Sequence, residues 1–220
     1  MIKTQTDLCT AIKFLIKADP VLSQIIQVTP NLKLCYRKPN FEGLIQIIIN
    51  QQISNKAAQT IFQRLKTFYA NREITPVLIE NTSTDLIRSC GMSISKINFA
   101  KSLSQHFKTN PNFIEKLKKS DSESVITELE KLKGIGNWSS RIFALFYLQH
   151  PNIFVIGDAT ISKAMNKLYG KNHTLNEKQI STLKKRWSPH NSTACKILWA
   201  WVDNGMAGIN SDGFSELKNA

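Results

Sequence analysis

The apolar positions of the chain recur with the spacing of α-helices. Ile61, Leu65 and Phe68 follow one another at intervals of four and three residues, which predicts a buried stripe on one helix. Helix starts are marked by capping residues, as at Asp19–Pro20, where an N-cap residue precedes a proline at the first helical position. About ten helices are predicted, over residues 20–28, 41–50, 55–69, 86–91, 95–107, 123–131, 137–148, 159–169, 177–187 and 191–206. No segment alternates clearly with a period of two, so an all-α fold is expected.

Length and composition indicate a globular intracellular protein. The chain has 220 residues, 42% of them hydrophobic, which is enough to form a core in one large or two small domains. No run approaches the ~20 apolar residues of a membrane helix, and Lys13 and Lys17 interrupt any signal-peptide core. We therefore expect no membrane partner and a location in the cytoplasm, at a bacterial nucleoid, or in the nucleus.

The cysteines argue against a metal cluster. Cys9, Cys35, Cys90 and Cys195 lie far apart in the sequence and match no clustered ligand spacing. We expect reduced thiols, with no metal and no cofactor bound through them.

The net charge of +13 points to a polyanionic partner. Residues 159–202 carry eight basic side chains and one acid, Glu177, whereas 115–130 is rich in acids and is typical of a solvated face. The alternative is a composition bias, because Lys greatly outnumbers Arg and Ile and Asn are also abundant. The uneven distribution of charge favours nucleic acid.

Two glycines separated by one residue lie in a short turn between the helices predicted over 123–131 and 137–148. Glycines let a backbone approach a ligand closely, and the amides at the start of the second helix are suited to bind phosphate. The alternative is an ordinary helical corner in which Ile135 packs into the core. The residues expected to grip nucleic acid are Lys133, Gly134, Ile135, Gly136 and Asn137.

Several ordered motifs resemble those of one family. The segment 132–140 is followed by a Phe-containing turn and by Asp158, which lies 20 residues after Trp138. Residues 41–44, 51–54 and 57–58 are similar to an upstream segment of the same family, and 187–199 to a downstream one. Together they resemble the helix-hairpin-helix (HhH-GPD) base-excision DNA glycosylases, and most closely the DNA-3-methyladenine glycosylase II group, in a short form without the N-terminal β domain.

The resemblance implies both an architecture and a reaction. We expect a six-helix lobe over 36–150, a second lobe from 1–35 and 151–220, and a cleft for DNA and the target base between them. The expected reaction is hydrolysis of the N-glycosidic bond of an alkylated purine flipped out of duplex DNA. Asp158 is the expected catalytic carboxylate, and simple N-capping of the helix over 159–169 is the alternative role.

The same resemblance assigns aromatic and wedge residues. Trp138 and Trp199 are expected to line the base pocket, with core packing as the alternative for each. Gln52 or Ile53 is expected to fill the gap left by the flipped base, unless Ile53 is a buried hinge residue. Trp187 and Trp201 are assigned to the core.

Departures from the family pattern refine the expectation. Trp138 stands where strand-cleaving relatives carry a Schiff-base lysine, so a monofunctional enzyme is expected. Asn191 stands where the group usually has Arg, which puts a local phosphate contact or ion pair in doubt. By analogy alone, carbonyls of Lys133 and Ile135 are candidates for a structural monovalent cation. We expect a monomer acting on alkylated double-stranded DNA; the competing hypothesis is a non-catalytic protein that binds distorted or alkylated DNA.

Overall fold

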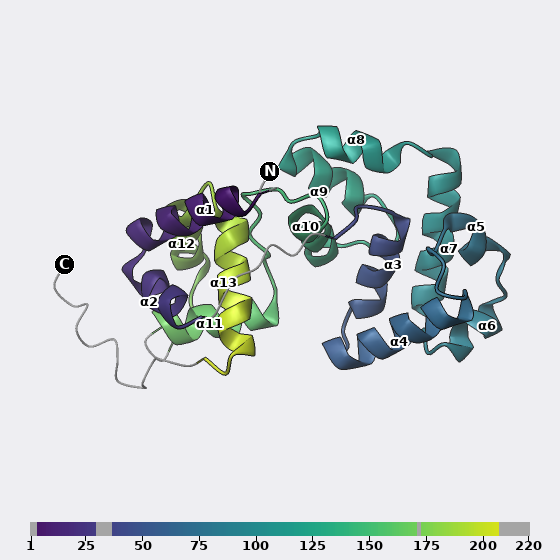
Figure 1. Cartoon of the computed structure of the whole chain (residues 1–220), viewed down its shortest axis with the longest axis horizontal. Helices are drawn as coiled ribbons and strands as arrows, with labels where there is room; N and C mark the ends of the chain where they lie inside the picture. The colour runs from purple at the N-terminus through teal and green to yellow at the C-terminus, as the bar shows by residue number, and fades with distance from the viewer. Residues whose placement is uncertain (1–3, 30–36, 171–172, 207–220) are drawn as a thin grey trace. The chain divides into compact units, whose positions relative to one another are not determined.

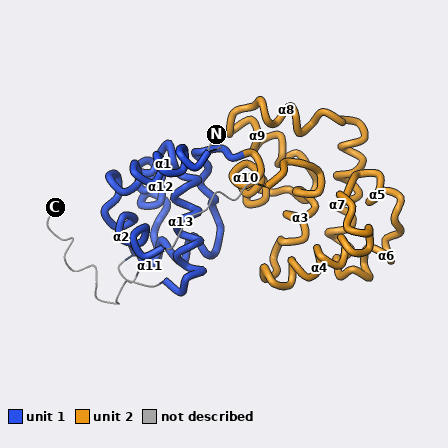
Figure 2. The backbone as a smooth tube through the Cα atoms, in the orientation of Figure 1, with its two compact units in different colours: residues 1–35, 149–220 blue, residues 36–148 orange. Residues whose placement is uncertain are grey.

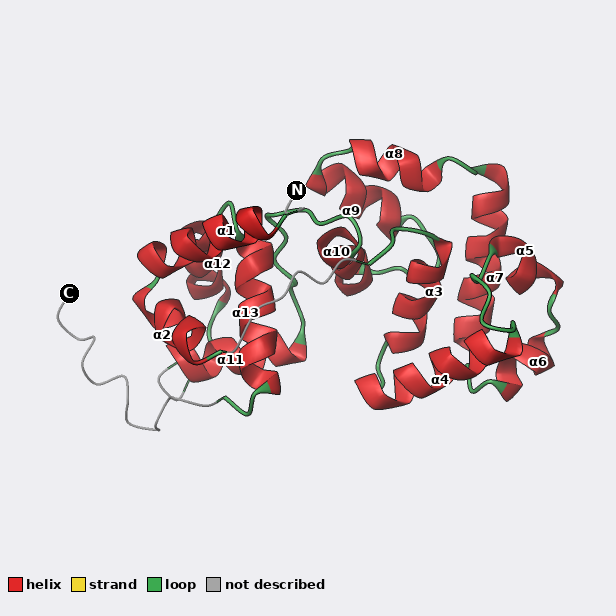
Figure 3. Ribbon diagram, viewed as in Figure 1, coloured by secondary structure: helices red, strands yellow, loops and turns green. Residues whose placement is uncertain are grey.

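The computed structural model describes residues 4–29, 37–170 and 173–206. Within these ranges the secondary structure consists of helices joined by short loops, without strands, which confirms the all-α prediction (Figures 1 and 3). In chain order the helices are α1 (Gln5–Ala18), α2 (Pro20–Val28), α3 (Phe41–Asn50), α4 (Asn55–Phe68), α5 (Pro76–Asn81), α6 (Thr84–Ser89), α7 (Ile94–Thr109), α8 (Phe113–Lys119), α9 (Ser122–Glu130), α10 (Asn137–Phe146), α11 (Ala159–Tyr169), α12 (Glu177–Trp187) and α13 (Asn191–Asp203).

The chain divides into two compact units (Figure 2). Unit 1 comprises residues 1–35 and 149–220 and contains α1, α2, α11, α12 and α13. Unit 2 comprises residues 36–148 and contains α3 to α10, eight helices where the sequence predicted six. The cleft expected between two lobes stays a prediction.

Unit 2 is organised around α3. Every residue of this helix from Phe41 to Ile49 except Glu42 and Gln46 is buried, so the helix is apolar on almost all sides. Such a helix is stable in water only when others surround it. It packs against α4, α7 and α10, and the preceding residue, Asn40, caps its first turn by accepting a hydrogen bond from the Gly43 amide.

Helix α13 has the same role in unit 1. Its residues from Asn191 to Leu198 are all buried, together with Trp201. It packs against α1, α2, α11 and α12, so helices from both ends of the chain share one core (Figure 2). The assignment of Trp187 and Trp201 to the core is confirmed, since they are 0% and 1% exposed.

A buried carboxylate, Asp19, ties three helices of unit 1 together. Its Oδ1 caps α2 by accepting hydrogen bonds from two backbone amides, at 3.0 and 3.1 Å. Its Oδ2 accepts from Tyr169 Oη at 3.1 Å on α11 and from Trp187 Nε1 at 2.9 Å on α12. Burial, and then the negative charge of Asp19, raise the pKa of the Tyr169 hydroxyl well above its usual range, so this hydroxyl remains a donor. A charge fully removed from water is tolerated here because its oxygens are hydrogen-bonded and because Arg186 Nη1 lies 3.5 Å from Oδ2 as an ion-pair partner.

Three helices were missed by the sequence interpretation. Helix α1 begins with a capping box between Thr4 and Asp7, and α5 begins with Thr75 before a proline, the same signal that had identified α2. Helix α8 has seven residues and no side-chain cap at its N-terminus, so only its buried apolar residues could have marked it. The first two could have been found from capping chemistry alone.

Two expectations about individual side chains were wrong. Phe68 is 42% exposed, because the buried stripe of α4 narrows to Ala58 and Leu65. Lys196 is 8% exposed and donates to Gln149 Oε1 at 3.3 Å, so it adds nothing to the surface charge of the basic segment, residues 159–202.

Asn191, which stands where the family usually has Arg, is buried. Its side-chain amide donates to Asn152 Oδ1 at 2.6 Å and to the Lys184 carbonyl at 3.1 Å. In this chain Asn191 therefore makes internal packing contacts.

We expect Asp19→Ala to lower the free energy of unfolding by about 3 kcal/mol, because it leaves buried donors unpaired and removes a helix cap. Urea denaturation followed by tryptophan fluorescence measures this change. The control is Asn176→Ala, which removes an exposed cap from α12 in the same unit and should cost about 1 kcal/mol. Equal losses for the two variants would contradict the structural importance assigned to Asp19.

Candidate functional site

Asp158 closes a short loop that leads into α11. Ile153, Phe154 and Val155 are buried and anchor the loop, while Ile156 and Gly157 are exposed. Gly157 has a φ of +79°, a left-handed conformation that favours glycine, so the chain turns immediately before Asp158. The carboxylate is therefore presented at the start of a helix by a loop whose other side is fixed in the core.

One stripe of α13 holds this loop in place. The Ile153 amide donates to Ser192 Oγ at 2.9 Å, and the Cys195 thiol lies 3.8 Å from the Ile153 carbonyl. Trp199 Nε1 donates to Asp158 Oδ1 at 3.0 Å. Ser192, Cys195 and Trp199 are spaced by three and four residues, so they lie on the same side of α13. Burial raises the pKa of the Cys195 thiol to about 12, which keeps it protonated.

The carboxylate of Asp158 is half-buried and oriented by two donors. The Ile161 amide donates to Oδ1 at 2.9 Å, which makes Asp158 the N-cap of α11, and Trp199 donates to the same oxygen. The N-terminus of a helix stabilises negative charge nearby. Capping, the alternative role for Asp158, is thus confirmed, and it is compatible with catalysis because capping fixes the orientation of the carboxylate.

The structure places the two expected pocket tryptophans differently. Trp199 is half-buried in unit 1, and its indole N–H is directed at Asp158, a contact that sequence reasoning did not foresee. Trp138 is half-buried in the first turn of α10 in unit 2. An aromatic pocket that uses both therefore stays a prediction.

The turn between α9 and α10 uses its two glycines for different purposes. Gly134 has a φ of +87°, and a Cβ added to it would collide with the Phe99 ring of α7. Gly136 has an extended backbone, which any residue adopts, and a Cβ added there would meet nothing within 4 Å. The backbone conformation and the packing of Phe99 therefore require glycine at position 134. The space beside Gly136 is open among the described residues, so the fold does not require glycine there. The side chain of Ile135 is 3% exposed, so the corner also packs into the core, as its alternative interpretation expected.

Open space at Gly136 lies beside the start of α10. Gly136 is the N-cap of this helix and supplies no side-chain cap, and both Gly136 and Asn137 are exposed. Lys133 is exposed on the same turn. An anion that approached here would meet backbone amides, the positive end of the helix dipole and a lysine.

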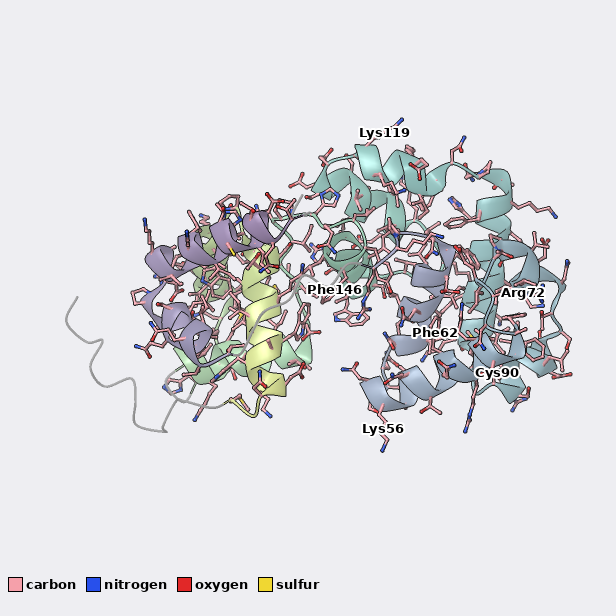
Figure 4. The ribbon with its side chains drawn as sticks, viewed as in Figure 1. Lys56, Phe62, Arg72, Cys90, Lys119 and Phe146 are labelled. Atoms are coloured by element: carbon pink, nitrogen blue, oxygen red, sulfur yellow. The ribbon has the colours of Figure 1, made fainter. Side chains whose placement is uncertain are left out.

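The loop between α3 and α4 contains the two expected wedge residues. Gln52 is exposed and has a φ of +56°, which is unusual for a residue with a side chain. Ile53 is 37% exposed, so its alternative role as a buried hinge is wrong. Lys56, in the first turn of α4, extends away from the helices (Figure 4). The loop thus presents polar, apolar and basic groups outward.

Gln51 was not selected from the sequence, yet it connects this loop to the turn. Its Nε2 donates to the Gly134 carbonyl at 2.7 Å and to Ser139 Oγ at 2.9 Å. The signal was present in the paired glutamines at 51–52, but a sequence pattern does not show which of two neighbours faces inward.

The basic segment of unit 1 is exposed in part. Lys184 is half-buried, with its ammonium 5.7 Å from the Phe154 ring centroid beside the Asp158 loop. Lys171 falls outside the described residues. The exposed cations of the segment are Lys163, Lys167, Lys178, Lys185 and Arg186.

The described residues contain no group of three or more His, Cys, Asp or Glu side chains arranged to hold a metal ion. None of their helices is both long and apolar enough to cross a membrane. The cation expected at the carbonyls of Lys133 and Ile135 stays a prediction.

Comparison with known proteins places these features in a family. Residues 45–189 match the model of the HhH-GPD superfamily of base excision DNA repair proteins. The chain is 27% identical to DNA-3-methyladenine glycosylase 1 of Schizosaccharomyces pombe over 174 residues, which covers 77% of this chain and 75% of that protein.

Two solved structures are similar in fold. The crystal structure of a DNA-3-methyladenine glycosidase from Bacillus halodurans has a TM-score of 0.76 at 26% identity, covering 89% of this chain and 90% of that one. The S. pombe 3-methyladenine DNA glycosylase Mag1 in complex with abasic DNA has a TM-score of 0.78 at 24% identity, covering 88% and 97%. With a model match over most of its length, the chain belongs to the HhH-GPD superfamily of base excision DNA repair proteins.

Proposed function

We propose that this protein is a monofunctional DNA glycosylase that hydrolyses the N-glycosidic bond of alkylated purines, such as 3-methyladenine and 7-methylguanine, in duplex DNA. The observation that carries the proposal is the Asp158 carboxylate, held between the Ile161 amide and the Trp199 indole. The names of the S. pombe and B. halodurans relatives support the choice of alkylated bases.

The chemistry of an alkylated purine explains why one carboxylate is sufficient. The ring of 3-methyladenine or 7-methylguanine is already cationic in the nucleotide, so the base leaves without needing a strong general acid. As the bond breaks, positive charge develops on the sugar. The fixed negative charge of Asp158 stabilises it and orients the water that adds to the sugar, whose proton passes to the carboxylate or to solvent. The products are the free base and an abasic site.

Access to the base requires flipping, and the exposed loop after α3 is suited to support it. A flipped base leaves a gap in the stack, which Gln52 or Ile53 would fill. Aromatic faces favour a cationic base over a normal one by about 0.5–2 kcal/mol. Trp138 and Trp199 are the proposed aromatic faces, and Trp199 also orients Asp158.

DNA is gripped without regard to sequence at the turn before α10. The amides beside Gly136 and the side chain of Lys133 would bind backbone phosphate, which positions the enzyme but carries no base information. A structural cation at the carbonyls of Lys133 and Ile135 would add to this grip. The proposed partner is alkylated double-stranded DNA, bound by a monomer of this chain.

The absence of strand cleavage is part of the proposal. Trp138 occupies the position at which lyase members of the family carry lysine, so no amine is available there to form a Schiff base. Borohydride treatment of an enzyme reaction with DNA containing the lesion should trap no covalent complex. A trapped complex would instead support a glycosylase with lyase activity.

We expect Asp158→Asn to reduce base release from methylated DNA by about 10²- to 10³-fold, because the charge is lost while the capping oxygen is kept. Chromatography of released 3-methyladenine and 7-methylguanine measures the rate. Binding to duplex DNA should persist. If the wild type binds methylated DNA but releases neither base, the protein is a non-catalytic binder of alkylated or distorted DNA and the enzyme proposal fails.

Trp199→Phe separates hydrogen bonding from stacking. The variant keeps an aromatic face and loses the N–H that orients Asp158, so we expect kcat to fall about tenfold with KM little changed. Trp201→Phe, a substitution of the same type in the core of α13, controls for lost packing. An unchanged kcat for Trp199→Phe would leave stacking as the function of this residue.

Gly136→Val should weaken binding to all duplexes alike, damaged or not, because the added side chain fills the space through which phosphate approaches. Its thermal stability should remain close to wild type. Gly134→Ala is the contrasting variant and should lower the melting temperature, since alanine is strained at a φ of +87° and collides with Phe99. Fluorescence anisotropy with labelled duplexes and thermal scans measure both effects; loss of binding to a single sequence would contradict the phosphate role.

A further inference from the structure

Helix α7 contacts both elements of unit 2 that we propose to face DNA. These two DNA-facing elements are the wedge loop, residues 51–54 between α3 and α4, and the phosphate-gripping turn, residues 131–136 between α9 and α10. Lys96 and Phe99 lie one turn apart on this helix, so their side chains lie on the same side. Lys96 reaches the end of α3, where the loop with Gln52 and Ile53 begins. Phe99 packs against Gly134 of the turn before α10. Neither residue belongs to the chemistry described above.

Lys96 is bonded to backbone rather than to an acid. Its Nζ donates to the Ile49 carbonyl at 2.8 Å and to the Gln51 carbonyl at 2.9 Å. Carbonyls at the end of a helix have no partner within the helix, so a cation here both satisfies them and complements the helix dipole. Burial lowers the pKa of the Lys96 ammonium, because removal from water disfavours its charge, and the two hydrogen bonds offset this loss of hydration.

The side chain of Gln51 extends this contact to the turn. Lys96 donates to the backbone carbonyl of Gln51, and the side-chain amide of Gln51 donates to the Gly134 carbonyl and to Ser139 Oγ. Gly134 in turn packs against Phe99. The contacts therefore run from α7 through the loop and the turn and back to α7.

This arrangement stabilises an unfavourable backbone. Gln52, directly after Gln51, has a φ of +56°, and such a conformation persists only where the surrounding structure enforces it. On the N-terminal side of Gln52, Lys96 holds the chain by hydrogen bonds to the Ile49 and Gln51 carbonyls. On the C-terminal side, Ser54 fixes the chain as the N-cap of α4. Without them the loop would relax and its exposed side chains would shift.

We propose that Lys96 is a positioning residue for base extrusion, acting through Gln51 to hold the wedge loop at a fixed distance from the phosphate-gripping turn. The inference rests on the proposed glycosylase function. A rigid link means that phosphate bound at the turn places the wedge against one particular base step. Loss of the link leaves the grip on DNA intact and makes extrusion of the base inefficient.

The test compares Lys96→Met with Lys101→Met. Lys101 is on the same helix and also donates to a backbone carbonyl, that of Thr82 at 3.0 Å, which follows α5 and belongs to neither the loop after α3 nor the turn before α10. Single-turnover release of 7-methylguanine is measured from duplexes that pair it with cytosine or mispair it with thymine. Extrusion costs less from a mispair, so a positioning defect is expected to reduce excision roughly 10- to 100-fold for the paired lesion and clearly less for the mispaired one.

Further readouts separate positioning from folding. Lys96→Arg, which keeps donors for both carbonyls, should restore most of the paired-lesion rate, and affinity for undamaged duplex should stay within about twofold of wild type. If Lys96→Met does not fold, Gln51→Met provides the same test from the other side of the link. Equal losses on both duplexes, or a Lys96→Met variant that behaves like Lys101→Met, would overturn the proposal.

Failure of the glycosylase function is distinguishable from failure of this inference. If the wild type releases no base, extrusion is followed by the fluorescence of 2-aminopurine placed beside the lesion. Lys96→Met should then lower the fluorescence rise on binding, and Lys101→Met should not. An unchanged rise would refute the positioning role independently of catalysis.

Discussion

The two hydrogen bonds that fix the direction of the Asp158 carboxylate are the interactions on which the proposed site of unit 1 depends, because a carboxylate that stabilises charge on a sugar must have a fixed direction. The loop that carries it is short, apolar on its buried side and turned by Gly157. Its stability depends on α13, which supplies Ser192, Cys195 and Trp199 along one stripe. The core of unit 1, including the contacts of Asp19, holds α13 and α11 and so maintains this geometry.

Unit 2 contains two exposed elements, the loop between α3 and α4 and the turn between α9 and α10, whose relative positions are fixed by polar contacts. The proposed roles of the loop between α3 and α4 and of the turn before α10 require both to face outward, so neither can be held by burying its own outer side chains. Polar contacts from behind replace that burial: Gln51 bonds to the turn and Lys96 to the loop. The two glycines of the turn also differ in their surroundings. Gly134 packs against Phe99, whereas the space beside Gly136 is open.

Capping chemistry and periodic burial made most of the helices predictable. Asp19 before Pro20 and the predominantly apolar α3 are local signals that tertiary structure did not override. The missed α8 is short and lacks a side-chain cap, and its buried face packs against α9 and, through Phe113, against Phe107 of α7. Phe68 has the right spacing for burial, but exposure at the end of a helix depends on which neighbour covers it, and spacing alone does not specify that.

By itself the sequence determined the helical class and the turn with its paired glycines, because each follows from residues close together in the chain. Its ordered motifs also predicted a role in chemistry for Asp158. Tertiary structure decided which atoms meet. The bond from Trp199 to Asp158 and the link from Lys96 through Gln51 to Gly134 join residues more than forty positions apart. Hydrogen bonds of this kind depend on helix packing and side-chain direction, which no local pattern encodes.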